Sequence, residues 1–247
     1  MRIDVLLGEG HVAAADVAGR VVVVVDVLRA ATTVAVAIAN GARAVIPFEH
    51  VDEVAVRAKQ FERTDIRLGG ERKMQRIPGF DLGNSPQDFT RDVVEGRTIL
   101  YSTTNGTAAL LATQGARSCF FAGFVNLRAT ILAARKSVAP DGNILVMCSG
   151  TDRRCALEDV VCAGLLVRGI ARARSDVTFG DGAFIARTLS RRYDGNLSRI
   201  ATDSSHANAL IAAGFTADVT RCLEMNSVPV AVAYHERQLV RHGTKGR

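Results

Sequence analysis

The chain has 247 residues, of which 48% are hydrophobic, 5% aromatic and 23% charged, and its formal net charge is +6. This apolar fraction supplies a buried core and excludes wholesale disorder. The basic residues are scattered, and no basic run carries interleaved aromatic side chains that would stack on bases. The composition therefore predicts a small anionic partner and no nucleic acid.

Cysteine usage and hydropathy indicate the compartment. Five cysteines occur without a CxxC pair, which indicates neither a disulfide framework nor a zinc site. No apolar run approaches the roughly 20 residues of a membrane span, and the start "MRIDVLLGEG" lacks the apolar core of a signal peptide. We expect a cytoplasmic protein with no membrane partner, whose abundant Val and Ala would also support a homodimer.

Short β-branched runs alternate with alanine- and leucine-rich stretches along the chain. The predicted strands cover residues 20–27, 44–48, 66–72, 98–102, 118–123, 143–150 and 228–234. The predicted helices cover residues 31–42, 51–63, 104–116, 126–138, 157–173 and, as one helical stretch, 179–215. This alternation predicts a three-layer α/β/α fold with a mostly parallel (mixed) central sheet. No linker-like composition divides the chain, so we expect a single domain over residues 1–247.

Ligands of such sheets collect beyond the carboxyl ends of the strands, and three polar turns stand at such positions. The first is "DVLRAATT", behind the five valines at 21–25. Asp26 ends the strand, Arg29 offers a planar fork to phosphate or carboxylate, and Thr32 and Thr33 add hydroxyl donors. The turn is equally compatible with an ordinary Asp–Arg ion pair at the start of a helix.

The second turn, "YSTTNGTAAL", concentrates small polar residues between a strand and a helix. They are Ser102, Thr103, Thr104, Asn105, Gly106 and Thr107. Free N–H groups at a helix start bind anions, and a glycine lets the backbone approach the ligand. No lysine follows the glycine, so the turn is not a Walker loop. A cap needs only one such residue, so the run predicts an oxyanion site.

The third turn, "MCSGTDRRCALEDVVCAG", carries adjacent carboxylates at Glu158 and Asp159. They either complement the dipole of the following helix or bind a hard divalent cation through oxygen. Together with Asp26 they would form an oxygen-rich magnesium site.

The same turn contains a rival motif. Cys148 and Arg154 match C-x5-R, with Gly150 between them, as in cysteine-dependent phosphatases whose thiolate attacks phosphorus. Cys148 is equally compatible with an inward-facing strand residue.

A long irregular segment, "GGERKMQRIPGFDLGNSP", supplies further candidates. Glu71 and Arg72 follow a strand end, and Asp81, Asn84 and Ser85 stand in a turn-rich stretch, where such residues are structural or functional. The five histidines show no metal-binding spacing, and neither GxSxG nor GxGxxG occurs. Serine hydrolase and dinucleotide-binding functions are therefore not indicated.

These motifs together resemble one family. "VVVVVDVLRAATTV", "GGER", "GFDLGNSP", "TTNGT", "FVN", "CSG" and "LEDVVCAG" follow the order and spacing of the 2-phosphosulfolactate phosphatase (ComB-like) family. The resemblance runs from about residue 20 to about residue 165 and continues more weakly through "SSHANALIAAGFTADVTRCL". It implies a magnesium-dependent phosphatase that converts (R)-2-phospho-3-sulfolactate to 3-sulfolactate and phosphate on the route to coenzyme M.

The resemblance also carries site residues across. The matching positions are Asp26, Arg29, Thr32, Thr33, Glu71, Arg72, Asp81, Asn84, Ser85, Thr103 to Thr107, Asn126, Cys148, Gly150, Glu158 and Asp159. We expect Asp26, Glu158 and Asp159 to bind Mg²⁺, with Glu71 next. Arg29 and the Thr103–Thr107 turn are expected to hold phosphate oxygens, and Arg72 or another nearby Arg the sulfonate.

Several alternatives stay open at this point. The chain departs from the family pattern at "TDRRCA" and "GGERKMQRI", so it can keep the phosphate chemistry and act on a different phospho-acid. Cys148 could serve as the nucleophile. If water attacks instead, Asp26 or Glu71 could orient it. A non-catalytic module that senses a phosphoester would use the same turns.

Overall fold

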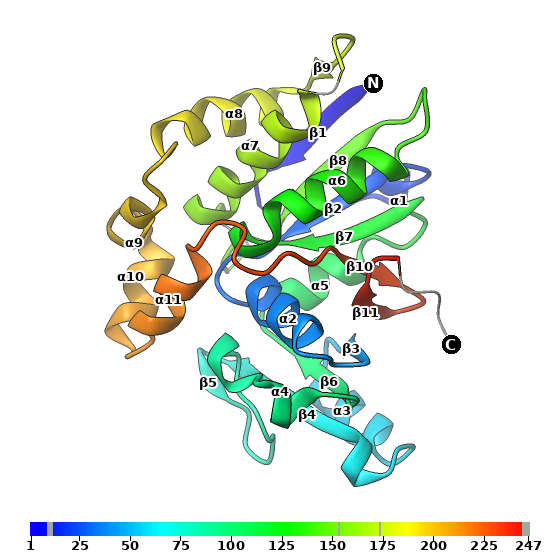
Figure 1. Ribbon diagram of the computed structural model, residues 1–247, viewed down its shortest axis with the longest axis vertical. Helices are drawn as coiled ribbons and strands as arrows, with labels where there is room; N and C mark the ends of the chain where they lie inside the picture. The colour runs from blue at the N-terminus through cyan, green and yellow to red at the C-terminus, as the bar shows by residue number, and fades with distance from the viewer. Residues whose placement is uncertain (9–11, 153, 173, 244–247) are drawn as a thin grey trace.

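Figure 1 shows the computed structural model, which describes residues 1–8, 12–152, 154–172 and 174–243. The last residue of the helix predicted over 157–173 and the end of the C-terminal tail lie outside the described residues. The strands are β1 (Arg2–Leu6), β2 (Val21–Val25), β3 (Ala44–Pro47), β4 (Ile66–Arg72), β5 (Gln75–Arg76), β6 (Thr98–Ser102), β7 (Ser118–Ala122), β8 (Ile144–Cys148), β9 (Thr178–Phe179), β10 (Val232–His235) and β11 (Gln238–Arg241). The helices are α1 (Ala14–Val17), α2 (Ala30–Ala39), α3 (Val51–Ala58), α4 (Arg91–Val94), α5 (Gly106–Leu111), α6 (Leu127–Ser137), α7 (Leu157–Ala171), α8 (Asp181–Arg192), α9 (Ile200–Asp203), α10 (Ser205–Ala212) and α11 (Thr216–Cys222).

The described strands form one sheet in the order β5-β4-β6-β3-β11-β10-β7-β2-β8-β1-β9. Two blocks are internally parallel, β4-β6-β3 and β7-β2-β8-β1-β9. The β10–β11 hairpin lies between them and pairs antiparallel with β7 on one side and β3 on the other. Three successive antiparallel pairings mean that the two blocks run in opposite directions. The predicted α/β fold with a mixed, mostly parallel sheet is confirmed.

The five valines of β2 are buried because helices cover both faces of the strand. Side chains alternate between the faces of a strand, and here Val21, Val23 and Val25 enter one core while Val22 and Val24 enter the other. The first core contains residues of α6, α7 and α8, and the second contains residues of α2. Figure 1 shows these helices above and below the sheet. A strand covered on both faces is apolar at every position.

The predicted elements differ from the structure mainly near the two ends of the chain. Strand β1 was not predicted, and the strand predicted over 228–234 begins only at Val232 and turns back into β11. The stretch predicted as helical over 179–215 begins with the last residue of β9 and then contains three separate α-helices, α8, α9 and α10. Gly195 and Gly214 interrupt it with φ values of 73° and 92°, which L-residues with side chains rarely adopt.

Helix α7 packs closely against α8. At Gly164 of α7 an added Cβ would collide with the backbone carbonyl of Ala186 in α8, so the helices approach at a distance that only glycine allows. Neither α7 nor any other helix in the described ranges has the length and apolarity needed to cross a membrane.

We therefore expect Gly164→Ala to lower the free energy of unfolding by about 2 kcal/mol, because backbone must move to admit the methyl group. Gly169→Ala on the same helix is the matched control, since the atoms nearest to its Cβ would belong to the side chain of Ile131 and not to backbone. Urea denaturation followed by circular dichroism measures both variants. The close approach is refuted if Gly164→Ala is as stable as the wild type or more stable.

Candidate active site

A cavity of about 300 Å³ lies where the carboxyl ends of the two strand blocks meet. Its wall comes from the segments that follow β2, β4, β6 and β8, together with α10. The polar residues that line it are Asp26, Arg29, Glu71, Lys73, Asn84, Thr103, Thr104, Asn105, Thr151, Asp152 and His206. Strands β2 and β6 are not neighbours in the sheet. Their polar turns converge nevertheless, because the two blocks direct their carboxyl ends toward the same cavity.

The charged side chains buried in the described residues all lie around this cavity. They are Asp26, Glu71, Glu158, Asp159, Asp218 and Arg29. The set thus contains five carboxylates and one guanidinium. Burying a charge costs free energy unless the charge is paired or hydrogen-bonded. The partners of each carboxylate therefore show which ones have spare capacity for a ligand.

Asp26 has the fewest partners of the five. Its Oδ1 accepts a hydrogen bond from the backbone N–H of Ala30 at 3.1 Å, and no donor in the described residues engages Oδ2. Burial raises the pKa of Asp26 to about 6, with further contributions from the charges of Glu71 and Glu158. Oδ2 lies only 2.5 Å from the point where a Cβ on Gly106 would stand. The glycine of the second turn therefore lets that turn approach this carboxylate.

Arg29 is held by a buried ion pair. Its Nη1 donates to Oδ2 of Asp218 at 2.7 Å, Nη2 donates to the carbonyl of Met74 at 3.2 Å, and the guanidinium lies 4.2 Å from the ring centre of Phe215. Asp218 also accepts from the hydroxyl of Ser85 at 2.6 Å. The sequence left an Asp26–Arg29 ion pair open, but Arg29 pairs with Asp218 instead, so most of its charge is already balanced.

Glu71 joins two loops of the wall. Its Oε1 accepts the N–H of Thr104 at 2.8 Å, and its Oε2 accepts the N–H of Met74 at 2.9 Å. Both oxygens are therefore occupied, and the carboxylate fixes the β4–β5 hairpin to the turn after β6.

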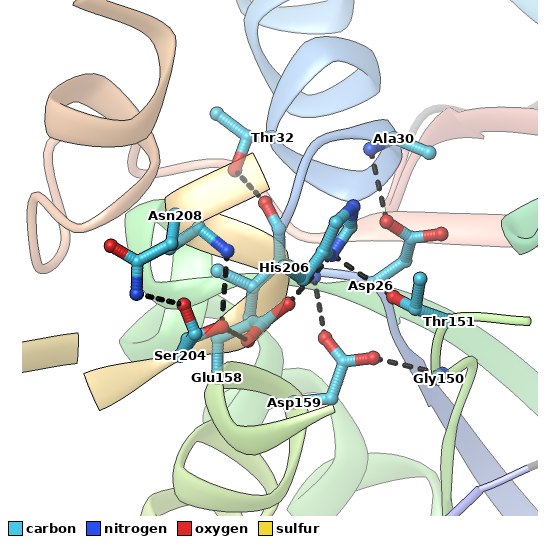
Figure 2. A network of polar contacts seen from close by, with 12 residues as sticks. Asp26, Ala30, Thr32, Gly150, Thr151, Glu158, Asp159, Ser204, His206 and Asn208 are labelled. Carbon is cyan, nitrogen blue, oxygen red and sulfur yellow. Dashed lines mark hydrogen bonds and ion pairs between the residues drawn. The ribbon is translucent and has the colours of Figure 1, made fainter. Parts of the chain in front are cut away.

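Glu158 holds a histidine that lines the cavity (Figure 2). Its Oε1 bonds to Nδ1 of His206 at 2.9 Å, and its Oε2 accepts from the hydroxyl of Ser204 at 2.7 Å. Thr151 Oγ1 is a second neighbour of the same Nδ1, at 3.0 Å. Burial lowers the pKa of His206, but the hydrogen bond and charge of Glu158, together with Asp26, outweigh it and raise the pKa above its ordinary value.

Asp159 connects the loops that follow β2 and β8. Its two oxygens accept the N–H groups of Val27 at 2.8 Å and of Gly150 at 3.0 Å, as Figure 2 shows for Gly150. Burial, and the neighbouring carboxylates Glu158 and Asp26, raise the pKa of Asp159 well above its ordinary value. Gly150 has φ +69° and an added Cβ would strike the carbonyl of Arg154, so this loop conformation requires glycine.

The second polar turn keeps unused donors near Asp26. In the described residues no acceptor takes the backbone N–H groups of Asn105 and Gly106, whereas Thr103 donates its N–H to Thr107 Oγ1 at 3.3 Å. Thr103, Thr104 and Asn105 line the cavity. Free N–H groups and hydroxyls at such a turn suit an oxyanion.

Other candidates from the sequence lie behind the cavity wall. Thr32 and Thr33 donate their hydroxyls to the carbonyls of Val27 and Asn84 at 3.2 and 3.0 Å. Asn126 accepts the N–H of Gly123 and donates to the carbonyl of Phe121. None of these three polar residues is among the residues that line the cavity.

The Arg72 side chain is turned away from the cavity. Its guanidinium bonds to the carbonyls of Glu49 and Glu71 and to the hydroxyl of Ser102, at 2.8 to 2.9 Å. Arg72 is not among the lining residues, whereas its neighbour Lys73 is.

Cys148 is the last residue of β8 and is buried in the core. Burial and the charge of Asp159 raise the pKa of its thiol well above the ordinary value. A nucleophilic cysteine needs a thiolate and access to the substrate, and Cys148 is not among the lining residues. Both observations count against a thiolate mechanism.

The residues predicted to bind magnesium are Asp26, Glu158 and Asp159. Among the described residues, no group of three or more His, Cys, Asp or Glu side chains is arranged to hold a metal ion. The oxygens of Glu158 and Asp159 already have protein donors, so their role as ligands stays a prediction. Oδ2 of Asp26 is free, and Mg²⁺ commonly binds through one or two carboxylates, waters and substrate phosphate. Oδ2 of Asp26 is thus a carboxylate oxygen open to such an ion, and Mg²⁺ binding stays a prediction.

Several residues of the site were not predicted from the sequence. His206, Asp218, Ser204 and Lys73 belong to no recognised spacing. Asp218 lies 189 residues from Arg29, and His206 and Ser204 lie 48 and 46 residues from Glu158. Ser204, His206 and Asp218 fall in the weakly matching "SSHANALIAAGFTADVTRCL", and Lys73 directly follows "GGER".

Comparison with known proteins gives consistent results. The family model described as 2-phosphosulpholactate phosphatase matches residues 9–237. A probable 2-phosphosulfolactate phosphatase of Symbiobacterium thermophilum is 38% identical over 227 residues, which cover 92% of this chain and 96% of the relative. A protein with the same description from Caldicellulosiruptor saccharolyticus is 35% identical over 83% of this chain and 85% of the relative. Another from Clostridium beijerinckii is 28% identical over 97% of this chain and 99% of the relative.

The raised pKa of Asp26 predicts a stability change that is independent of activity. A carboxyl group whose pKa is about 6 when folded and 3.8 in the reference state binds its proton more tightly in the folded protein. Its ionisation therefore lowers the free energy of unfolding as pH rises from about 4 to about 6, and the free energy of unfolding stays lowered by the full amount at higher pH. In EDTA at pH 8, Asp26→Asn should raise the free energy of unfolding by on the order of 2 to 3 kcal/mol.

The gain should disappear near pH 4, and urea denaturation at both pH values measures it. The exposed Asp141 provides the control, since Asp141→Asn should change stability by less than about 0.5 kcal/mol at either pH. An Asp26→Asn protein that is less stable than the wild type at pH 8 would show that the Asp26 carboxylate is not a destabilising buried charge.

Proposed function

Because the chain belongs to the 2-phosphosulfolactate phosphatase family, we propose that it is a phosphoric monoester hydrolase that acts with Mg²⁺. The proposed reaction is hydrolysis of (R)-2-phospho-3-sulfolactate to 3-sulfolactate and phosphate, the step of coenzyme M synthesis that the resemblance implies. One observation carries the proposal. The free oxygen of the buried Asp26 stands beside the donor-rich turn at Gly106, in a cavity with an excess of carboxylates.

The charge of the cavity supports the need for a cation. A phosphate monoester is anionic, and carboxylates near its site oppose binding unless a positive charge lies among them. Arg29 cannot supply much of that charge, because it is paired with Asp218. Bound Mg²⁺ neutralises phosphoryl charge and polarises the P–O bonds. Asp26 is its proposed protein ligand, through Oδ2.

The second turn would hold the phosphoryl oxygens. The unused N–H groups of Asn105 and Gly106 and the hydroxyls of Thr103 and Thr104 are donors on the cavity wall. Donors fixed in advance stabilise the charge that gathers on these oxygens in the transition state. Glu71 contributes indirectly, because its bond to the N–H of Thr104 fixes the turn.

His206 is the proposed proton donor to the leaving alcohol oxygen. Glu158 and Thr151 engage its Nδ1, which leaves Nε2 without a partner in the described residues. The raised pKa keeps more of the ring protonated at neutral pH, as a general acid requires. Glu158 would then orient the imidazole and stabilise its charged form.

Phosphate release from (R)-2-phospho-3-sulfolactate tests the proposal. The wild type should turn over with Mg²⁺ and lose activity in EDTA. Asp26→Asn should reduce kcat at least about a hundredfold, as loss of a principal electrostatic group does. Mg²⁺ with phosphate should raise the melting temperature of the wild type but not that of Asp26→Asn.

Cys148→Ala is the matched control and should keep turnover within a few-fold of the wild type. Activity that survives EDTA but is lost in Cys148→Ala would replace the magnesium mechanism with a thiolate mechanism. Binding of the phosphoester without phosphate release would favour a non-catalytic sensor.

A further inference from the structure

The cavity is lined by an arginine and a lysine, and of the two only the arginine has an ion-pair partner among the described residues. Arg29 is buried against Asp218 and donates to the Met74 carbonyl. Lys73 is exposed and lines the same cavity, and no carboxylate in the described residues forms an ion pair with it. Lys73 is therefore the cation with charge available for a ligand.

Lys73 occupies a turn position that its residue type disfavours. Strands β4 and β5 pair antiparallel with Arg72 opposite Gln75, so Lys73 and Met74 form the two-residue turn. Their φ values are 50° and 68°, which is the conformation that Asn-Gly sequences favour in such hairpins. Unfavourable backbone conformations of this kind gather at ligand-binding sites.

The turn is held against the cavity from both sides. Met74 donates its N–H to Glu71 Oε2 at 2.9 Å and accepts Arg29 Nη2 on its carbonyl at 3.2 Å. The same Glu71 also binds the N–H of Thr104 in the proposed phosphate turn. The base of the Lys73 side chain is thus fixed relative to the phosphate-binding wall, while its ammonium group stays accessible.

A second cavity, of about 640 Å³, adjoins the first on this side. The two cavities share Met74, Thr151, Asp152 and His206 as lining residues. Arg154 lines the second cavity and has no ion-pair partner among the described residues. Lys73 thus lines the first cavity and Arg154 the second, and Asp152 is the carboxylate among the residues that the two cavities share.

The residues that the two cavities share come from the hairpin turn, the loop after β8 and α10. They lie far apart in the sequence, yet Met74 and Thr151 line the same two cavities. Asp26 lines the first cavity and not the second.

We propose that Lys73 binds the strong acid group that the substrate carries in addition to its phosphate, and so determines specificity for phosphoesters of acids. The inference rests on the proposed function, because it takes the phosphate to lie at Asp26 and the second turn. A sulfonate or a carboxylate would form a charge-assisted hydrogen bond with the ammonium group. Arg154 adds positive charge in the adjoining cavity.

The test compares two substrates with the whole protein and Mg²⁺. (R)-2-Phospho-3-sulfolactate carries two further acid groups, whereas glycerol 2-phosphate is a secondary phosphoester without any. In Lys73→Gln the ratio of their kcat/KM values should fall about tenfold, chiefly through a higher KM for the acidic substrate. Lys73→Arg should restore most of the ratio.

Arg76→Gln is the matched control, since Arg76 is on the same hairpin, donates to the Asp81 carbonyl and lines neither cavity. It should leave the ratio unchanged. Equal losses for both substrates in Lys73→Gln, or no loss for either, would overturn the proposal.

A failure of the proposed function gives a different result, namely no phosphate release by the wild type from either compound. In that event calorimetric binding of (R)-2-phospho-3-sulfolactate decides the matter. Affinity about tenfold lower in Lys73→Gln than in the wild type supports the role of Lys73, and equal affinity contradicts it.

Discussion

Five buried carboxylates and one buried guanidinium surround the cavity, and the arrangement of the site depends on how this unequal set is compensated. Asp218 is balanced by Arg29, and Glu71 and Asp159 each accept two backbone N–H groups. Glu158 is bound by Ser204 and His206. Asp26 retains a free oxygen and a raised pKa. The uncompensated charge is therefore concentrated at one atom beside the donor-rich turn, where a cation and a phosphate would relieve it together.

The same carboxylates connect loops at the ends of paired strands within each block, β2 and β8 in one and β4 and β6 in the other. Strands β2 and β6 belong to blocks that run in opposite directions, with the β10–β11 hairpin between them. Asp159 joins the loops after β2 and β8, and Glu71 joins the β4–β5 hairpin to the turn after β6. Groups that hold the fold together thus also position the donors of the cavity, which explains why so many charges are buried in one place.

Local sequence predicts the features that depend on neighbouring residues. The valines of β2 and the polar turns at Asp26 and Gly106 follow from alternation and from the position of strand ends. Features that depend on distant partners could not be predicted in this way. The ion pair of Arg29 spans 189 residues, and His206 reaches Glu158 from a separate helix. Strand β1 is five residues long and has two charged residues, so its pattern is too weak to identify without its neighbour β8.

The central claim is that a cation must relieve the carboxylate excess before the cavity can bind phosphate. Calorimetric titration of the wild type with inorganic phosphate, in the presence of Mg²⁺ and in EDTA, tests it most directly. Because binding of two linked ligands is reciprocal, phosphate should bind at least about tenfold more tightly with Mg²⁺, and Mg²⁺ should bind more tightly with phosphate by the same factor. Equal phosphate affinity in the two conditions would contradict the account.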